Sequence, residues 1–573
     1  MPRATKIVAT LGPASSTPEV LDAMLKAGVD VVRLNFSHGK AQDHIDRAQL
    51  VREAAARVGK VVAIMADLQG PKIRVGKFAE GKVMLEPGQA FVLDASRTEL
   101  GDIAGVGLDY KELPRDVRPG DILLLNDGLI VLTVEAVKGE AVHTVVKLGG
   151  ELSNNKGINK QGGGLTAPAL TAKDMEDIKT AASFQCDYIA VSFPKNSTDM
   201  EMARQLCNVA GEPWKHRPAL IAKIERTEAI PNLESILKAS DGIMVARGDL
   251  AVEVGNAAVP ALQKRMIKLA REMDKVVITA TQMMESMIVN PVPTRAEVSD
   301  VANAVLDGTD AVMLSAETAA GKYPVETVEQ MANIALEAER AEEVSLDADF
   351  TNQTFARIDQ SIAMGALFTA YHLGCKAIIA LTESGSTALW MSRHKIHVPI
   401  FALTARPISQ RKMALYRNVR PLLIPSYSDR DEALQQAATL LVERGVLLAP
   451  AGGDIEVEHL FAKPWRPSPD EAVIGARGTL YKDAIYQHLG RRYMSTDLDL
   501  DNSSGTGRGV LRTTGDEHDL IAVGHKPSGD GIPKLSGTRD AGHDHGAGTG
   551  RRHGVLSARL RDPTRRERLR AWR

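Results

Sequence analysis

Short apolar runs rich in Val, Ile and Ala alternate with amphipathic helical patterns along most of the chain. Such alternation is typical of βα units that build a parallel sheet. Except between the third and fourth, successive runs begin roughly 20 to 35 residues apart, which accommodates a strand, a helix and two loops. The runs are Ile7–Gly12, Val29–Ser37, Val61–Leu68, Tyr188–Phe193, Ala219–Glu225, Gly242–Asp249, Val276–Gln282 and Ala311–Glu317. Eight such units predict an α/β fold, a (β/α)8 TIM barrel.

The interval between the third and fourth runs is too long for a loop and contains β-type segments among Gly and Pro. These segments are Asp121–Leu125, Leu129–Ala136 and Ala141–Leu148. They predict a small β-barrel domain inserted after the third barrel strand. Beyond the barrel, a helix is expected over Ile358–Leu373 and buried strands over Lys376–Thr382 and Val398–Thr404, which together indicate a second α/β domain.

The chain is therefore expected to divide into a barrel, an inserted domain, an incomplete C-terminal α/β domain and a tail. The ranges are 1–70 and 168–345 for the barrel, 71–167 for the insertion, 346–461 for the C-terminal domain and 462–573 for the tail. The tail is rich in Gly, Arg, Asp, Ser and His, which predicts disorder. Its end, Arg551–Arg573, is interpreted as a solvated segment, with a nucleic-acid-binding arm as the alternative. The cluster His543-Asp544-His545 lacks convincing metal-site spacing.

The composition narrows the class of protein. The chain has 573 residues, of which 44% are hydrophobic and 25% charged, as in ordinary globular proteins. Its 70 Lys and Arg residues balance 72 Asp and Glu residues, which argues against a global nucleic-acid-binding role. Cys186, Cys207 and Cys375 lie too far apart in sequence to indicate a disulfide framework or a zinc site. Because neither a signal-type segment nor a membrane-length apolar run occurs, a cytoplasmic location without membrane contact is expected.

Polar residues close several of the apolar runs, at the ends where barrel enzymes hold their chemistry. They are Arg33, Asn35 and Ser37 in the second run, Asp67 in the third, Lys223 and Glu225 in the fifth, Arg247 and Asp249 in the sixth, and Thr281 in the seventh. Residues two apart on a strand share one face, so we expect these side chains to form one site. His38 is interpreted as organising the turn after the second run, with an acid/base role as the alternative.

Glu225 and Asp249 lie on neighbouring runs and offer two hard oxygen ligands, which favours a Mg²⁺ site. The alternative is that they only form ion pairs with Lys223 and Arg247. Lys223 and Arg33 add positive charge beside the carboxylates, which suits a phosphorylated or enolate-forming acidic substrate.

Five longer motifs resemble those of the pyruvate kinase family. They are Arg33-Leu34-Asn35-Phe36-Ser37-His38-Gly39, Gly70-Pro71-Lys72-Ile73-Arg74, Ala246-Arg247-Gly248-Asp249-Leu250, Ala280-Thr281-Gln282-Met283-Met284-Glu285-Ser286-Met287 and Leu314-Ser315-Ala316-Glu317-Thr318. The motifs occur in the family's order, and the resemblance extends from about Thr5 to about Val446. The sequence as a whole is most similar to the bacterial type that responds to AMP or sugar monophosphates.

The resemblance implies transfer of the phosphoryl group of phosphoenolpyruvate to ADP, giving ATP and, through an enolate, pyruvate in glycolysis. It also implies a homotetramer and a lid formed by the inserted domain. The implied site residues are Lys223 for stabilising the phosphoryl group and the enolate, Glu225 and Asp249 for Mg²⁺, Arg33, Gly248, Asp249 and Thr281 for the substrate, and Asn35, Ser37, His38 and Arg74 for the nucleotide. Arg33, Arg74 and Thr281 are further expected to act in catalysis.

One departure from the family pattern concerns the monovalent cation. Many members carry Glu where this chain has Lys72, and they bind K⁺ through residues that match Asn35, Ser37, Asp67 and Leu68. The ammonium of Lys72 is expected to supply the missing positive charge in this chain.

A second departure begins after Val446, where the chain continues Leu448-Ala449-Pro450-Ala451-Gly452-Gly453 instead of the family's last strands. A frameshift or a fusion would produce such a break. The loop that binds the effector phosphate in the family matches Thr382, Ser384, Ser386 and Thr387. We therefore expect half of a site for AMP or a sugar monophosphate, with a plain helix cap as the alternative.

Two other functions stay open at this point. A Mg²⁺-dependent aldolase or carboxyl-lyase of 2-oxo acids on the same barrel would also stabilise an enolate with a metal and a cation. A non-catalytic effector-binding or assembly subunit is the third hypothesis. ADP-dependent formation of pyruvate distinguishes the kinase from both.

Overall fold

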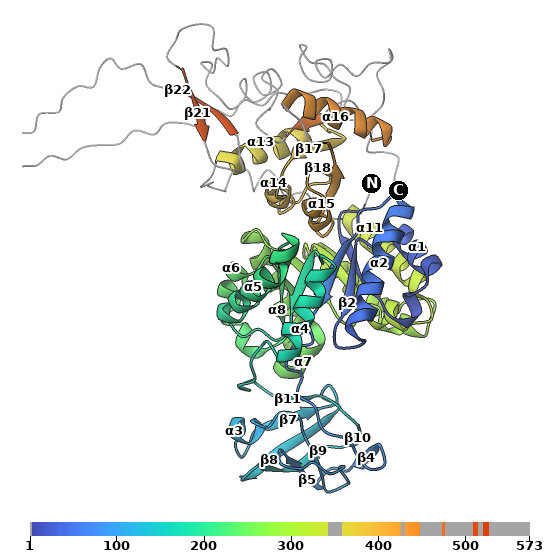
Figure 1. The fold of residues 1–573 in the computed structure, drawn as a ribbon, viewed down its shortest axis with the longest axis vertical. Coiled ribbons are helices and arrows are strands. Elements are labelled where there is room, and N and C mark those ends of the chain that lie inside the picture. Colours follow the sequence, from blue (N-terminus) through green and yellow to red (C-terminus); the bar gives the residue numbers. More distant parts are fainter. Residues whose placement is uncertain are drawn as a thin grey trace, which may run out of the picture. The chain divides into compact units, whose positions relative to one another are not determined.

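Eight parallel strands close into a barrel (Figure 1). The structure is a computed structural model that describes residues 3–341, 358–425 and 430–446, together with strands at 473–475, 508–513 and 520–525. In barrel order the strands are β1 (Lys6–Thr10), β16 (Ala311–Leu314), β15 (Val276–Ala280), β14 (Gly242–Ala246), β13 (Ala219–Ile224), β12 (Tyr188–Val191), β3 (Ala63–Asp67) and β2 (Val31–Asn35). All eight predicted barrel strands are confirmed.

The sixth predicted run was too long. Strand β14 ends at Ala246, and Asp249 lies in the first turn of helix α7 (Arg247–Val254). Leu250 and Val254 pack against the barrel core four residues apart, which is the spacing of neighbours on one face of a helix. The apolar residues after Ala246 therefore continue a helix rather than the strand.

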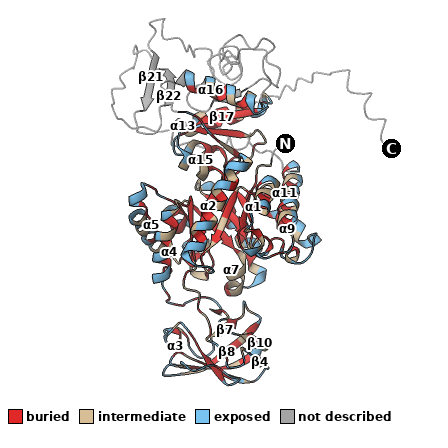
Figure 2. Cartoon of the chain, turned by 45° about the vertical axis from the view of Figure 1, so that its right-hand side comes forward, coloured by how far each residue is buried: buried red, intermediate tan, exposed pale blue. Residues whose placement is uncertain are grey.

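Helices flank the barrel strands, and Figure 2 shows the strands as buried and the outer helix faces as largely exposed. The long helices are α1 (Pro18–Ala27), α2 (Ala41–Val58), α4 (Ala172–Ser183), α5 (Ser197–Gly211), α6 (Leu233–Ala239), α8 (Val259–Glu272), α9 (Arg295–Leu306) and α11 (Pro324–Arg340). Shorter turns are η1 (Pro13–Ser15), η2 (Glu212–Trp214), η3 (Thr227–Ala229), η4 (Asn256–Ala258), η5 (Glu285–Ile288) and α10 (Ala316–Ala319). None of the described helices is both long and apolar enough to cross a membrane.

The inserted domain is built from β-strands around its own apolar core, which includes Phe91, Leu123 and Leu132. Its elements are β4 (Lys82–Leu85), β5 (Ala90–Asp94), β6 (Gly105–Gly107), α3 (Leu113–Asp116), β7 (Ile122–Leu125), β8 (Ile130–Lys138), β9 (Ala141–Leu148), β10 (Gly150–Ser153) and β11 (Ile158–Lys160). The predicted β character is confirmed. The strands pair as a six-stranded sheet, β11-β7-β8-β9-β5-β6, and a two-stranded sheet, β10-β4, rather than as one closed ring.

A second α/β domain follows the barrel, as predicted. Its elements are α13 (Ile358–His372), β17 (Ala377–Leu381), α14 (Ser386–Met391), β18 (Ile400–Thr404), α15 (Pro407–Met413), β19 (Val419–Leu423) and α16 (Arg430–Glu443). Its parallel sheet has the order β19-β18-β17-β20, where β20 (Val473–Gly475) comes from the segment predicted to be a tail. Two further strands, β21 (Arg508–Thr513) and β22 (Leu520–His525), pair with each other. The His543 cluster and the arginine-rich end lie outside the described residues.

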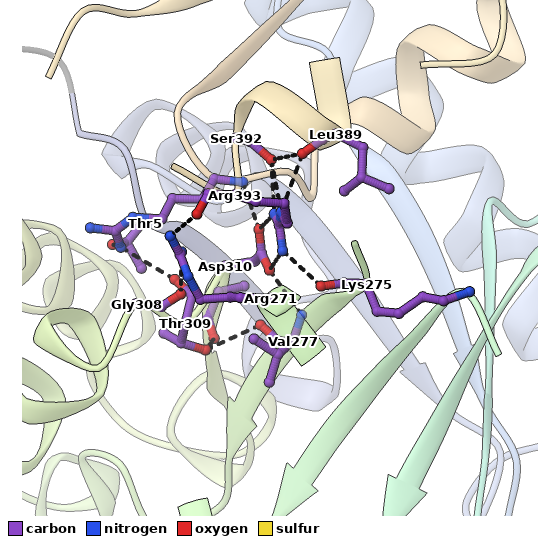
Figure 3. A network of polar contacts seen from close by, with 12 residues as sticks. Thr5, Arg271, Lys275, Val277, Gly308, Thr309, Asp310, Leu389, Ser392 and Arg393 are labelled. Carbon is purple, nitrogen blue, oxygen red and sulfur yellow. Dashed lines mark hydrogen bonds and ion pairs between the residues drawn. The ribbon is translucent and has the colours of Figure 1, made fainter. Parts of the chain in front are cut away.

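A buried ion pair joins the barrel to this second domain (Figure 3). Asp310 directly precedes β16, and its carboxylate receives both terminal nitrogens of Arg393, one of them at 2.9 Å. The backbone N–H groups of Val277 and Arg417 also donate to this carboxylate, at 2.9 and 3.0 Å. Asp310 is fully buried, and the charge of Arg393 compensates its carboxylate for the loss of water at this junction.

Candidate active site

The ends of β2, β3 and β13 bring four charged side chains into one network. Arg33 donates Nε to Oδ2 of Asp67 at 2.6 Å. Lys223 Nζ lies 3.3 Å from Oδ1 of the same aspartate and 2.8 Å from Oε1 of Glu225. Both carboxylates are 1% exposed, whereas the two cations keep about a tenth of their surface. The predicted gathering of Arg33, Asp67, Lys223 and Glu225 is therefore present.

Neutral groups complete the contacts of this network. Lys223 donates to the hydroxyl of Ser192 at 2.8 Å, and that hydroxyl donates to the carbonyl of Leu68 at 2.7 Å. The second carboxylate oxygen of Glu225 accepts the N–H of Phe193 at 2.9 Å. Each of these contacts restrains a charged side chain, which favours a preorganised site.

The electrostatics of the site follow from burial and charge pairing. Burial disfavours an ionised Asp67, but Lys223 and Arg33 outweigh it and hold the pKa of this carboxyl below its ordinary value. Burial likewise disfavours a charged Lys223, yet Asp67 and Glu225 raise the pKa of its ammonium above the ordinary value. Lys223 is therefore a permanent cation at physiological pH.

Glu225 behaves differently because burial, together with a second carboxylate nearby, outweighs its pairing with Lys223. Burial raises the pKa of Glu225 to about 7, with Lys223 opposing the shift and Asp249 adding to it. A divalent cation between two carboxylates would remove this repulsion, so the donor set fits such an ion. In the described part of the chain no three His, Cys, Asp or Glu side chains form a metal cluster. A Mg²⁺ ion bound here would thus take further ligands from water and substrate, as it usually does.

Thr281 and Gly248 are joined by a hydrogen bond. The N–H of Gly248, in the first turn of α7, donates to the hydroxyl of Thr281 at 2.9 Å. Thr281 and Gln282 hold positive φ angles of 66° and 54°, a conformation that costs free energy in residues with side chains. Such strain persists only where the surrounding contacts determine it.

Arg247 supplies those contacts and is not a partner of Asp249. Its guanidinium donates to the carbonyl of Thr281 at 2.7 Å and forms an ion pair with Asp300 at 2.7 Å. Of the two ion pairs expected as the alternative to a metal site, the pair of Glu225 with Lys223 is therefore present. The pair of Asp249 with Arg247 is not among the contacts of the described residues. Asp249 instead has the ammonium of Lys72 3.8 Å away.

The other predicted site residues occupy the turn after β2 and the start of the inserted domain. The side chain of Asn35 accepts the N–H of Ser37 at 3.1 Å. His38 is exposed, and its carbonyl contacts Nε2 of His44 at 3.0 Å, which fits the interpretation as a turn residue. Arg74 donates Nη1 to the carbonyl of Lys72 at 3.2 Å.

The four predicted effector residues lie in the loop between β17 and α14. Thr382 accepts the N–H of Gly385 at 3.0 Å, and the hydroxyls of Ser384 and Ser386 are 3.2 Å apart. Thr387 follows in the first turn of α14. These contacts form a compact polar loop, which suits both the phosphate site and the helix-cap alternative.

Two contact residues of the site were missed in the sequence. Thr10, the last residue of β1, accepts Nη1 of Arg33 at 3.0 Å, and Ser192 follows the last residue of β12. Both stand at strand ends, where the same rule that identified Asp67 applies. Their small neutral side chains carry no charge pattern, and this is why they were passed over.

A closed parallel barrel with an inserted β domain and a rim site of two carboxylates and a buried lysine defines an enzyme of the TIM-barrel class that acts on an anionic substrate. The family model "Pyruvate kinase, barrel domain" matches residues 2–328, and "Pyruvate kinase, alpha/beta domain" matches residues 360–453.

The chain is also similar to named proteins. It is 52% identical to pyruvate kinase II of Salmonella typhimurium over 460 residues, which cover 79% of this chain and 94% of that protein. It is 51% identical to the pyruvate kinase of Haemophilus influenzae over 450 residues, 78% of this chain and 93% of that one. The crystal structure of a pyruvate kinase from Cryptosporidium parvum superposes with a TM-score of 0.74 at 34% identity, covering 78% of this chain and 92% of that chain.

The chain belongs to the pyruvate kinase family. It transfers the phosphoryl group of phosphoenolpyruvate to ADP and forms pyruvate and ATP. This result overturns the aldolase or carboxyl-lyase alternative. Members of the family generally use Mg²⁺ and K⁺.

Proposed function

We propose that Lys223 is the catalytic cation of this pyruvate kinase. The supporting observation is its buried ammonium, held between Asp67 and Glu225 at 3.3 and 2.8 Å. A fixed positive charge at this point stabilises the phosphoryl group in flight and the enolate oxygen left behind. Phosphoryl transfer needs mainly positioning and neutralisation of charge, so no protein nucleophile is required.

The remaining roles follow from the same rim. Arg33 binds the phosphoryl group of the substrate, while Gly248, Asp249 and Thr281 hold its carboxylate end. Thr281 also organises the site where the enolate is protonated. The strained turn at Thr281, held by Arg247, supports this role because it keeps the hydroxyl in one position.

Nucleotide binding is assigned to the turn after β2 and to the inserted domain. Asn35, Ser37 and His38 lie in that turn, and Arg74 lies where the chain enters the insertion. The insertion then acts as a lid that covers the nucleotide and excludes water. This assignment uses the domain division 1–70, 71–167, 168–345 and 346–461.

Glu225 and Asp249 are the residues that hold Mg²⁺. When bound, the ion supplies positive charge that neutralises the phosphate oxygens. The raised pKa of Glu225 supports this role, because burial and, to a lesser extent, repulsion from Asp249 disfavour its charged form, and a divalent cation would offset both.

The purified full-length chain tests the assignment directly. We expect pyruvate to form only when phosphoenolpyruvate, ADP and Mg²⁺ are all present. Pyruvate formation without ADP, or no turnover at all, would contradict it, and the second result would favour a non-catalytic subunit.

The monovalent cation is a separate question. We infer that Lys72 replaces K⁺, since its ammonium lies 3.8 Å from Asp249 and supplies a fixed charge beside the substrate site. Under this proposal Asn35, Ser37, Asp67 and Leu68 no longer need to hold an ion. Two of these residues already have protein partners, since Oδ2 of Asp67 accepts a hydrogen bond from Arg33 and the carbonyl of Leu68 accepts one from Ser192.

We predict that the chain is active without added K⁺ and that Lys72→Glu makes activity dependent on K⁺. Assays in buffers free of Na⁺ and K⁺, with K⁺ then added back, measure both effects. A strong K⁺ requirement in the unmodified chain would show that Lys72 has another role.

The assembly and regulation belong to the same proposal. We infer a homotetramer of the bacterial type activated by AMP or a sugar monophosphate, with Thr382, Ser384, Ser386 and Thr387 as the phosphate-binding half of the effector site. The cysteines of the described residues are all buried thiols without a disulfide, which supports a reducing, cytoplasmic location.

A further inference from the structure

The chain returns from the inserted domain to the barrel through three consecutive glycines. Gly162, Gly163 and Gly164 have positive φ angles of 79°, 77° and 91°. Residues with a Cβ rarely adopt this backbone, whereas glycine adopts it at little cost. The segment is therefore a tight turn with more conformational freedom than the strands around it, as expected of a hinge.

A carboxylate from the barrel contacts this turn. Oε1 of Glu228, in η3, accepts the N–H of Gly164 at 2.5 Å. Its other oxygen is buried, has no hydrogen-bond partner among the residues that the structure describes, and lies 2.7 Å from the position that a Cβ on Gly163 would occupy. Arg226 fastens the next residue by donating Nη1 to the carbonyl of Leu165 at 3.2 Å. The carboxylate thus fits a turn of glycines and excludes a larger residue.

The elements that hold the hinge also carry the two metal candidates. Glu228 follows Glu225 by three residues on the loop after β13. Glu253 follows Asp249 by one helical turn in α7, and its backbone carbonyl accepts the N–H of Gly162 at 3.2 Å. A movement of the loop after β13 or of α7 when substrate and metal bind would therefore displace the residues that contact Gly164 and Gly162.

We propose that Glu228 is a positioning residue for the lid. Its carboxylate anchors the hinge turn to the loop of Glu225, so that the lid angle follows the state of the metal and substrate site. The glycines absorb the change of backbone angles, while the N–H groups of Gly162 and Gly164 keep the turn attached to the barrel. The inference rests on the proposed role of the inserted domain as a lid over the nucleotide.

Three variants test the anchor. Glu228→Ala removes the acceptor, Glu228→Gln keeps an acceptor oxygen without the charge, and Glu234→Ala is the control, because Glu234 is exposed and pairs with Lys238 on α6. The readouts are kcat and KM for ADP, the Kd of phosphoenolpyruvate by calorimetry, and hydrogen exchange of the hinge peptide.

Glu228→Ala should lower kcat/KM for ADP about tenfold and speed hydrogen exchange at the hinge, while the Kd of phosphoenolpyruvate stays within about twofold. Glu228→Gln should stay within about threefold of the unmodified chain, and Glu234→Ala should match it. The inference is overturned if Glu228→Ala equals the control, if it weakens phosphoenolpyruvate as much as ADP, or if Glu228→Gln is as impaired as Glu228→Ala.

A glycine pair gives an independent test. Gly162→Ala and Gly163→Ala both place a methyl group on a backbone with positive φ, since the φ angles of Gly162 and Gly163 are 79° and 77°. Only Gly163→Ala places this methyl group against the Glu228 carboxylate, since a Cβ on Gly162 meets nothing within 4 Å. Gly163→Ala should therefore be the more impaired toward ADP, and adding Glu228→Ala should relieve the excess.

Equal defects in the two glycine variants, unchanged by the second substitution, would overturn the inference even if Glu228→Ala alone failed to fold. The activity of the unmodified chain distinguishes failure of the proposed function from failure of the role of Glu228. If it forms no pyruvate, the proposed function fails. If it is active and the hinge variants match their controls, only the role of Glu228 fails.

Discussion

At the scale of single residues, the chemistry depends on one ammonium that the protein holds in place. Lys223 contacts Asp67, Glu225 and Ser192, and these contacts hold its ammonium in one position. A charge that is fixed in advance stabilises the transition state more than it stabilises the bound substrate. The reason is that negative charge develops next to the ammonium only as the phosphoryl group is transferred.

We predict that Lys223→Met retains binding of phosphoenolpyruvate but loses turnover by roughly a hundred- to a thousandfold, or about 2.7 to 4 kcal/mol. Calorimetry gives the affinity and a coupled assay gives kcat. Lys238→Met, an exposed lysine on α6, is the control and should keep full turnover. Turnover of Lys223→Met at the unmodified rate would refute the assignment.

At the scale of elements, the barrel strand β16 is joined to the domain that follows the barrel. Asp310 and Arg393 are separated by 83 residues in the chain, yet they form a buried ion pair that backbone N–H groups extend. Removing one partner of such a pair leaves a buried charge uncompensated, which costs more than the loss of a surface pair.

Arg393→Met should therefore lower the free energy of unfolding by about 3 to 5 kcal/mol. The matched control is Arg406→Met, which breaks the exposed pair of Arg406 and Glu383 and should cost less than about 1 kcal/mol. Urea unfolding followed by circular dichroism measures both. Similar small losses in the two variants would show that the pair at the junction does not stabilise the fold.

The same pair makes stability depend on pH. Burial opposes the ionised form of Asp310, but Arg393 and the surrounding N–H groups hold its pKa below the ordinary 3.8. A carboxyl with a depressed folded pKa stabilises the fold above its unfolded pKa and loses this contribution as pH falls through the folded pKa. Urea midpoints between pH 7 and pH 3 should fall more steeply for the unmodified chain than for Asp310→Asn. Parallel curves would contradict this.

At the scale of the whole molecule, the proposed regulation depends on a segment that departs from the family pattern. The loop of Thr382, Ser384 and Ser386 gathers hydroxyl and N–H groups, which are the donors that the proposed phosphate site requires. The resemblance implies an opposing wall from the family's last strands, which we expect to be missing from this chain after Val446. Allostery requires the effector to bind one conformation better than another, so a site with one wall transmits little.

We predict that AMP or ribose 5-phosphate activates this chain much less than a version whose residues after Val446 are replaced by a family-type ending. Activation of both chains is measured over a range of phosphoenolpyruvate concentrations. Equal and strong activation would mean that the effector binds elsewhere or that the segment after Val446 rebuilds the wall.

The sequence alone determined the eight barrel strands and the rim residues Arg33, Asp67, Lys223 and Glu225. Buried parallel strands are continuous apolar runs, and charged residues in the last part of such a run indicate the rim of the barrel. This local signal needs no knowledge of neighbours. It also explains the errors, since Thr10 and Ser192 are small and neutral and give no such signal.

Only the tertiary structure decided which charges meet. In the folded protein Arg247 pairs with Asp300 and contacts the turn at Thr281. Lys72 lies near Asp249, and Asp310 pairs with Arg393. The tertiary structure also brought Glu228 against the glycine hinge. Partners of this kind are distant in sequence, and a charge pattern does not encode distance. Which residues become partners depends on how the strands, helices and domains pack together, and no single segment of the sequence determines that packing.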